Sequence, residues 1–208
     1  MYWFFRPLIY IFIRLFYPFT VINKERADSS KPCIIVCNHL GGTDSFTVAC
    51  CFKKKVFFLG KKEWFQKQPL SGFLKMMGGL PVDRENVDLN AIKQCLTTLK
   101  QGKQLCIFPE GTRNRTGEEL LPLKSGVSMI AIKSKVDILP IFIYKKSKLF
   151  KRNYVAIGEK FSLEEFYGQK IDKTVCDQAT NVVKDHILAT KKELLDYLKE
   201  HKKIKSEH

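Results

Sequence analysis

The alternation of short apolar runs with helical patterns constrains the fold more than any other sequence feature. Five runs have the length and β-branched content of buried strands: 33–37, 56–60, 104–108, 137–144 and 154–158. Apolar residues at helical spacing cover 89–99, where Gly102 follows, and then 127–134 and about 173–203. Strands that alternate with helices predict a single layered α/β domain. We expect a mixed, largely parallel central sheet flanked by helices.

The N-terminal segment differs from this pattern. Of residues 2–19, 14 are apolar or aromatic, and nine of these are aromatic. Pro7 suits a first helical turn and Pro18 should end the helix, which leaves a helix of roughly 15 Å at 1.5 Å per residue. That length is about half of the ~30 Å hydrocarbon core of a bilayer. We therefore expect residues 1–22 to form an interfacial, monotopic membrane anchor, an additional membrane-associated helix before the α/β domain.

This segment has two alternative interpretations. A first core helix of a soluble protein is possible, although nine aromatic residues would be unusual in one short core helix. A cleaved signal peptide is disfavoured, because no small-residue cleavage site follows and Arg14 interrupts the apolar run. In the anchor interpretation, Arg6 and Arg14 point to lipid headgroups while the aromatic rings sit deeper.

The charge balance points to an anionic partner. Lys and Arg number 36 against 21 Asp and Glu, a formal net charge of +15. Much of the surplus lies in 53–62 and 145–152, while the aromatic residues gather at the N-terminus rather than between the basic ones. This separation favours an anionic membrane surface over nucleic acid, which we do not expect as a partner. A solvated basic face without any partner is the alternative.

The seven cysteines are odd in number and include no C-x-x-C pair, so a zinc site is not expected. Free cysteines in apolar runs indicate a reducing compartment. Together with the anchor, this predicts a membrane-associated protein on the cytoplasmic face.

His39 is the strongest candidate for a catalytic residue. It follows the apolar run 33–37, and Gly41 and Gly42 allow the chain to turn so that Asp44 can return to the imidazole. A carboxylate in that place would fix the tautomer of a general base. Two alternatives remain open: the residues only cap a strand and a helix, or Cys37 is a covalent nucleophile with His39 as its base.

Two further segments carry Arg beside predicted strand ends. GGLPVDRE (78–85) contains Arg84, and FPEGTRNR (108–115) contains Arg113 in a tight loop. Guanidinium groups bind phosphate through paired hydrogen bonds, although surface ion pairs are the alternative role. Backbone N–H groups near Gly111 could hold an oxyanion.

The His39-x4-Asp44 pair, the two Arg segments and ILPI (138–141) occur in the order of the four sequence blocks of the glycerolipid acyltransferases. Over about residues 33–145 the chain most closely resembles the 1-acylglycerol-3-phosphate (lysophosphatidic acid) acyltransferases. The resemblance implies an acyltransferase domain over 30–208 that includes the long C-terminal helix. The chain departs from the family pattern at two positions. Gly41 stands where the family commonly has Ser, and Asn114 stands where it commonly has Ser after the Arg.

The resemblance also implies the reaction. A fatty acyl group would pass from a thioester, acyl-coenzyme A or acyl-acyl carrier protein, to lysophosphatidic acid, giving phosphatidic acid in phospholipid biosynthesis with no cofactor or metal. His39 would be the base and Asp44 its partner. The implied substrate-binding residues are Arg84, Glu110, Gly111, Thr112, Arg113 and Lys124. Alternatives are glycerol-3-phosphate or another lysophospholipid as acceptor, and a basic, non-enzymatic membrane- or nucleic-acid-binding module.

Overall fold

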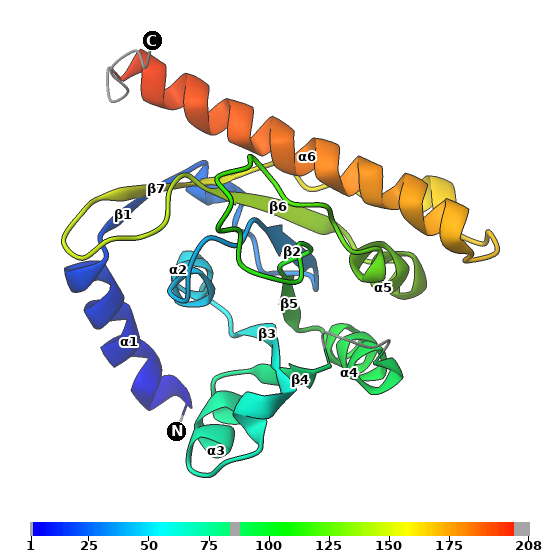
Figure 1. Cartoon of the computed structure of the whole chain (residues 1–208), viewed down its shortest axis with the longest axis horizontal. Helices are drawn as coiled ribbons and strands as arrows, with labels where there is room; N and C mark the ends of the chain where they lie inside the picture. Colours follow the sequence, from blue (N-terminus) through cyan, green and yellow to red (C-terminus); the bar gives the residue numbers. More distant parts are fainter. Residues whose placement is uncertain (1, 84–87, 202–208) are drawn as a thin grey trace.

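The strands of the computed structural model, which describes residues 2–83 and 88–201, form one seven-stranded sheet (Figure 1). The strands are β1 (Phe19–Ile22), β2 (Ile34–Cys37), β3 (Val56–Lys61), β4 (Gly79–Val82), β5 (Gln104–Ile107), β6 (Ile138–Ile143) and β7 (Asn153–Ile157). Their order is β1-β7-β6-β2-β5-β3-β4, and every neighbouring pair is parallel except β6 and β7. The predicted mixed, largely parallel α/β sheet is confirmed.

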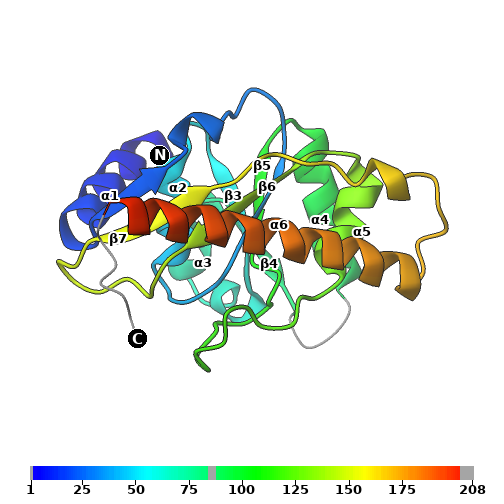
Figure 2. The ribbon, with the colours of Figure 1, turned by 90° about the horizontal axis from the view of Figure 1, so that it is seen from above.

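Helices cover both faces of the sheet. They are α1 (Tyr2–Phe16), α2 (Asp44–Cys51), α3 (Leu70–Met76), α4 (Leu89–Lys100), α5 (Gly126–Ser134) and α6 (Lys173–Glu200). Asp88 and Asp172 begin α4 and α6 as N-caps, since their carboxylates accept hydrogen bonds from Ala91 N and Val175 N. Helix α6 runs across the sheet on the side where α4 and α5 also lie (Figure 2).

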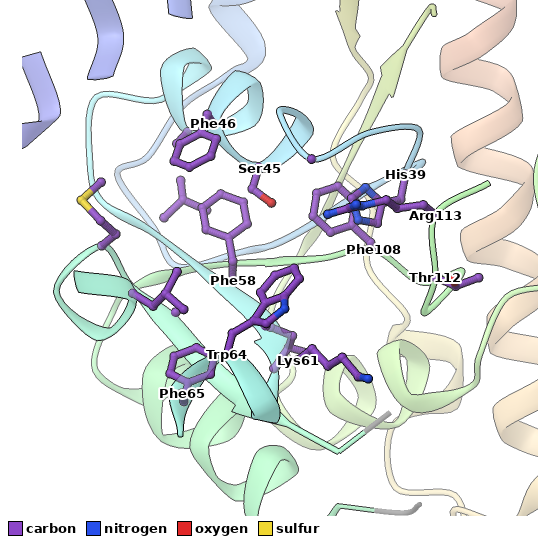
Figure 3. A pocket seen from close by; sticks show the side chains of 18 of the residues that line it. His39, Ser45, Phe46, Phe58, Lys61, Trp64, Phe65, Phe108, Thr112 and Arg113 are labelled. Atoms are coloured by element: carbon purple, nitrogen blue, oxygen red, sulfur yellow. The ribbon is translucent and has the colours of Figure 1, made fainter. Parts of the chain in front are cut away.

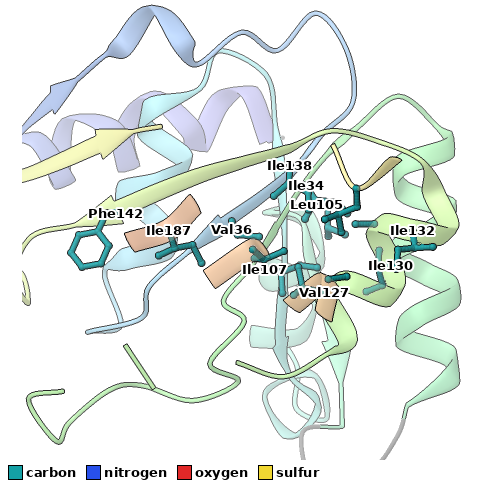
Figure 4. Packing of buried hydrophobic residues seen from close by; sticks show 14 of the residues in the cluster. Ile34, Val36, Leu105, Ile107, Val127, Ile130, Ile132, Ile138, Phe142 and Ile187 are labelled. Carbon is teal, nitrogen blue, oxygen red and sulfur yellow. The ribbon is translucent and has the colours of Figure 1, made fainter. Parts of the chain in front are cut away.

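Strand β2 lies at the centre of the sheet and is buried along its whole length. Ile34 and Val36 belong to the core beneath α4, α5 and α6, shown in Figure 4, whereas Ile35 and Cys37 belong to the core on the α1 and α2 side. Alternate side chains of a strand point to opposite faces, so one apolar run serves both cores. This packing fixes the position of the chain that leaves the carboxyl end of β2.

The structure changes the N-terminal prediction in two ways. Helix α1 begins at Tyr2, so Pro7 lies inside it instead of in its first turn, while the helix ends before Pro18 as predicted. Residues 19–22, expected within the anchor, form edge strand β1, because Phe19 and Ile22 bury their side chains when β1 pairs with β7. None of the helices among the described residues is long and apolar enough to cross a membrane.

The two arginines of α1 also depart from expectation. Arg6 donates to the backbone carbonyl of Phe52 at 2.6 Å, and Arg14 donates to that of Phe19. Both guanidinium groups therefore bind the α/β domain rather than pointing away from it. The opposite face of α1 leaves large apolar side chains exposed, namely Trp3, Phe4, Leu8, Ile11, Phe12 and Leu15.

Candidate active site

The candidate site lies at the carboxyl edge of the central parallel strands. His39 follows the end of β2 by two residues, and Phe108 directly follows the neighbouring strand β5. Because β2 and β5 are parallel, both residues emerge at the same edge, the usual place for ligands in open α/β sheets. The two rings stack, with 4.1 Å between centroids and 19° between planes.

The structure brings His39 and Asp44 together. His39 Nδ1 lies 2.9 Å from Asp44 Oδ2, and the same oxygen accepts hydrogen bonds from Leu40 N at 2.6 Å and Gly41 N at 2.7 Å. Asp44 is the first residue of α2 and is fully buried, and His39 is 6% exposed. The carboxylate thus holds the turn and the imidazole at once. It favours the tautomer with hydrogen on Nδ1 and a lone pair on Nε2.

The carboxylate of Glu110 binds the backbone of His39. Its Oε1 accepts from His39 N at 2.6 Å and its Oε2 accepts from Leu121 N at 3.0 Å, and the residue is 3% exposed. Burial raises the pKa of the carboxyl, while the two amides oppose that shift. The family resemblance implied that Glu110 lies around the phosphate-bearing acceptor. In the structure its oxygens bond two backbone amides, so it is a positioning residue for His39.

Asn114 supports the same position from the other side. Its backbone N–H donates to the carbonyl of His39 at 2.7 Å, and its side chain orders the following loop through Glu118 O and Thr116. His39 is therefore bound at its N–H, its carbonyl and its ring. The sequence noted Asn114 only as a departure from the family pattern, and its contact to His39 crosses 75 residues of chain, beyond the reach of local spacing.

Gly111 and Lys124 meet in a tight contact. Gly111 has a positive φ of 68°, a backbone conformation that favours glycine, and the flexible end of the Lys124 side chain fills the space beside it, with Cε 2.7 Å from where a Cβ would lie. The N–H of Gly111 donates to Phe108 O at 3.0 Å. Because this N–H already donates within the turn, it is not available to bind the oxyanion of a tetrahedral intermediate.

Thr112 and Arg113 face a cavity of about 510 Å³ that His39 also lines (Figure 3). Arg113 passes over Gly42, since a Cβ at Gly42 would be 3.4 Å from Arg113 Nη2. The sequence missed most of the apolar wall of this cavity, which includes Phe46, Phe58, Trp64, Phe65 and Phe108. Arg84, predicted to bind phosphate, lies outside the described residues.

The alternative nucleophile Cys37 is placed in the core. It is the last residue of β2, is fully buried, and packs in the cluster on the α1 and α2 face. Burial raises the pKa of its thiol well above the usual value, so the reactive thiolate is strongly disfavoured. Since β2 ends before His39, the shared strand face that the covalent alternative required is absent.

A family model described as Acyltransferase matches residues 18–144, more than half of the chain. The chain belongs to the acyltransferase family. This acyltransferase is 35% identical over 152 residues to the 1-acyl-sn-glycerol-3-phosphate acyltransferase of Bacillus subtilis, covering 70% of this chain and 75% of the relative. The Helicobacter pylori enzyme of that name is 31% identical, with 65% and 59% covered.

Other relatives extend the comparison. A chloroplastic 1-acyl-sn-glycerol-3-phosphate acyltransferase of Brassica napus is 29% identical over 81% of this chain and 50% of its own length. The crystal structure of the acyltransferase PlsC from Thermotoga maritima superposes with a TM-score of 0.68 at 22% identity, over 91% of this chain and 81% of that one. At that identity the superposition supports the fold. The matches confirm the family that the four sequence blocks predict.

Proposed function

We propose that this acyltransferase moves a fatty acyl group from a thioester to the free hydroxyl of lysophosphatidic acid and so forms phosphatidic acid. The observation that carries the proposal is the oriented His39–Asp44 pair at the mouth of an apolar cavity that Arg113 also lines. The names of the relatives, 1-acyl-sn-glycerol-3-phosphate acyltransferases, support the choice of acceptor. Glycerol-3-phosphate lacks the chain that such a cavity would hold.

The proposed reaction needs one base and passes directly between the substrates. His39 Nε2 accepts the proton of the acceptor hydroxyl as its oxygen attacks the thioester carbonyl carbon, and Asp44 stabilises the resulting imidazolium. The tetrahedral intermediate collapses with cleavage of the carbon–sulfur bond. The departing sulfur takes the proton from Nε2, which yields an ester and a free thiol and restores the neutral imidazole.

The charges at the cavity that His39 and Arg113 line suit a phosphate-bearing acceptor. The charged residues that line it are Lys61, Arg113 and Arg115, and no carboxylate is among its described lining residues. In lysophosphatidic acid the phosphate is attached to the carbon next to the one bearing the reacting hydroxyl. A cation that binds this phosphate must therefore stand beside the base, as Arg113 does, lining the same cavity as His39.

Arg113→Ala should raise the KM for lysophosphatidic acid by about 10–100-fold, because a hydrogen bond to a charged group contributes about 1.5–3 kcal/mol. The value of kcat should change far less, since His39 and Asp44 keep their contacts. Initial rates in detergent micelles over a range of acceptor concentrations measure both constants. Lys184→Ala, which removes an exposed cation on α6 outside this cavity, is the control. An unchanged KM for lysophosphatidic acid in Arg113→Ala would show that Arg113 does not bind the acceptor.

We further infer that the exposed face of α1 rests on an anionic membrane surface. At one end of the helix Phe16 packs on Phe150, with 5.5 Å between ring centroids, and at the other Phe5 meets the edge of Phe73 at 6.3 Å. Exposed apolar residues thus continue from α1 into Leu149 and Phe150. Exposed basic residues flank these two in the same loop, namely Lys148, Lys151 and Arg152. An apolar surface bordered by cations is typical of interfacial binding.

The double variant Phe4→Asp/Ile11→Asp should lower partition to anionic vesicles at least about tenfold, because each buried apolar side chain contributes about 1.5–3 kcal/mol. Both residues are exposed, so the melting temperature should hardly change. Sedimentation with phosphatidylglycerol vesicles at low and high salt measures the bound fraction. Leu89→Asp, an equally exposed apolar position at the start of α4, is the control. Equal binding by the unaltered protein, the double variant and Leu89→Asp would exclude α1 as the membrane contact.

A further inference from the structure

A separate hollow of about 470 Å³ lies between α1 and the edge strand β1, which follows α1 in the chain (Figure 1). Its wall also includes Cys50, from the last turn of α2. Among the residues that the structure describes, this wall has no member in common with the cavity that contains His39. The hollow is therefore distinct from the candidate active site, and it has the volume of a small-molecule site.

The charged side chains that line the hollow are all cationic. They are Arg14 of α1, Lys24 after the end of β1, and Arg152, which precedes the residue of β7 that pairs with Phe19 at the start of β1. Within residues 2–83 and 88–201, no carboxylate lines the hollow and none of the three cations forms an ion pair. Like charges around one space repel one another, and a bound anion removes that repulsion.

The guanidinium of Arg14 is already oriented in the hollow. It lies 4.7 Å from the centroid of the Phe19 ring and 5.7 Å from that of the Tyr10 ring, and it donates to the carbonyl of Phe19. A guanidinium carries several N–H donors in a rigid fork, so one bond to a carbonyl leaves others for phosphate oxygens. Because these contacts exist before a ligand arrives, binding costs less side-chain entropy.

The surroundings of the hollow favour an amphiphilic ligand. Ile11 and Leu15, which neighbour Arg14 on α1, are exposed, and so is Phe150, two residues before Arg152. Two of the three cations therefore lie at the border of an exposed apolar surface. A phosphate with attached hydrocarbon chains can use the cations and this surface together, whereas a free phosphate can use only the cations.

We propose that this hollow binds the phosphate headgroup of an anionic membrane lipid, at a site separate from the site of acyl transfer. The phosphate oxygens accept hydrogen bonds from Arg14, Lys24 and Arg152, and the chains of the lipid lie along the exposed apolar residues of α1. The lipid bound here is not a substrate, since His39 lies outside the hollow. The inference does not depend on the proposed reaction, and it adds a defined binding site to the membrane contact inferred for α1.

Protection of Cys50 from alkylation tests the proposal, because Cys50 lines the hollow and is half-buried while the other six cysteines are buried. Full-length protein is treated with iodoacetamide at rising concentrations of dihexanoyl-phosphatidylglycerol, kept below its critical micelle concentration. Peptide mass spectrometry follows the modification of each cysteine. Dihexanoyl-phosphatidylcholine supplies the same chains with a zwitterionic headgroup, and inorganic phosphate supplies the anion without chains.

Phosphatidylglycerol should slow the alkylation of Cys50 in a saturable way, at concentrations where phosphatidylcholine and inorganic phosphate have little effect. The double variant Lys24→Gln/Arg152→Gln should raise the half-saturating concentration of phosphatidylglycerol by about tenfold or more, because both lost contacts to the phosphate are charge-assisted. Both residues are exposed, so the melting temperature should hardly change.

Two controls separate this site from general charge attraction and from the active site. Lys148→Gln/Lys151→Gln removes the same number of positive charges at exposed positions of the neighbouring loop, outside the hollow, and should change the half-saturating concentration by less than about twofold. Arg113→Ala, in the cavity that contains His39, should leave the protection of Cys50 unchanged.

Four outcomes would overturn the proposal. They are no protection of Cys50 by phosphatidylglycerol, equal protection by phosphatidylcholine, protection by inorganic phosphate at concentrations as low as those of phosphatidylglycerol, and equal weakening by the two double variants. Failure of the proposed acyl transfer or of the membrane contact by α1 would not produce these results, because the experiment measures neither phosphatidic acid nor binding to vesicles.

Discussion

His39→Ala should lower kcat by about a hundredfold to ten-thousandfold, the usual contribution of one positioned base. The imidazole is the group that can take the hydroxyl proton, and the loops around it are held by Glu110 and Asn114 through the backbone of residue 39, which alanine preserves. The KM values for both substrates should therefore change little. Steady-state rates with a palmitoyl thioester and lysophosphatidic acid measure the effect.

Cys37→Ala is the control for this experiment. The thiol is buried in the core next to the site, so its loss should reduce the melting temperature while most of the activity remains. Abolished turnover in folded Cys37→Ala, together with an acylated Cys37 isolated from the unaltered protein, would contradict direct transfer. It would favour the covalent route instead.

Asp44→Asn should also lower kcat by about a hundredfold to ten-thousandfold. The amide oxygen can take the place of Oδ2 and accept from Leu40 N and Gly41 N, with its NH₂ group at Oδ1, which has no hydrogen-bond partner among the described residues. The turn can thus be kept while the negative charge is lost. Without that charge the imidazolium formed during attack is no longer stabilised, which acts on kcat more than on KM.

The same substitution at Asp172 separates this effect from a loss of stability. Asp172 is the N-cap of α6 and accepts a hydrogen bond from Val175 N at 3.0 Å. It does not line the cavity that contains His39. Asp172→Asn should leave kcat unchanged and lower the melting temperature slightly. If Asp44→Asn kept full kcat at an unchanged melting temperature, the charge of Asp44 would have no part in the reaction.

Much of the sheet could be predicted because its central strands are continuous apolar runs. The predicted run 104–108 became β5 and 137–144 became β6, with shifts of one residue at their ends. The edge strand β1 was missed, and β4 was predicted only as a short extended segment before Arg84. Each is only four residues long, and Pro81 lies within β4, a residue that sheets tolerate at their edges. Their pairing depends on neighbours remote in sequence.

The site shows the same division between local and long-range information. His39 and Asp44 could be paired because the turn between them is short and contains two glycines. The role of Glu110 could not be inferred, because its bond to His39 N spans 71 residues and appears only once β2 and β5 lie side by side. Arg6 and Arg14 were likewise misplaced, since their backbone acceptors Phe52 and Phe19 become available only in the folded chain.

The most direct test of the account is an end-point assay with the purified protein. Lysophosphatidic acid is incubated with palmitoyl-coenzyme A or with palmitoyl-acyl carrier protein, and the lipids are separated by mass. The account predicts phosphatidic acid that carries both chains, with release of one free thiol per ester formed, from at least one donor. The absence of phosphatidic acid with both donors, from folded protein, would contradict it.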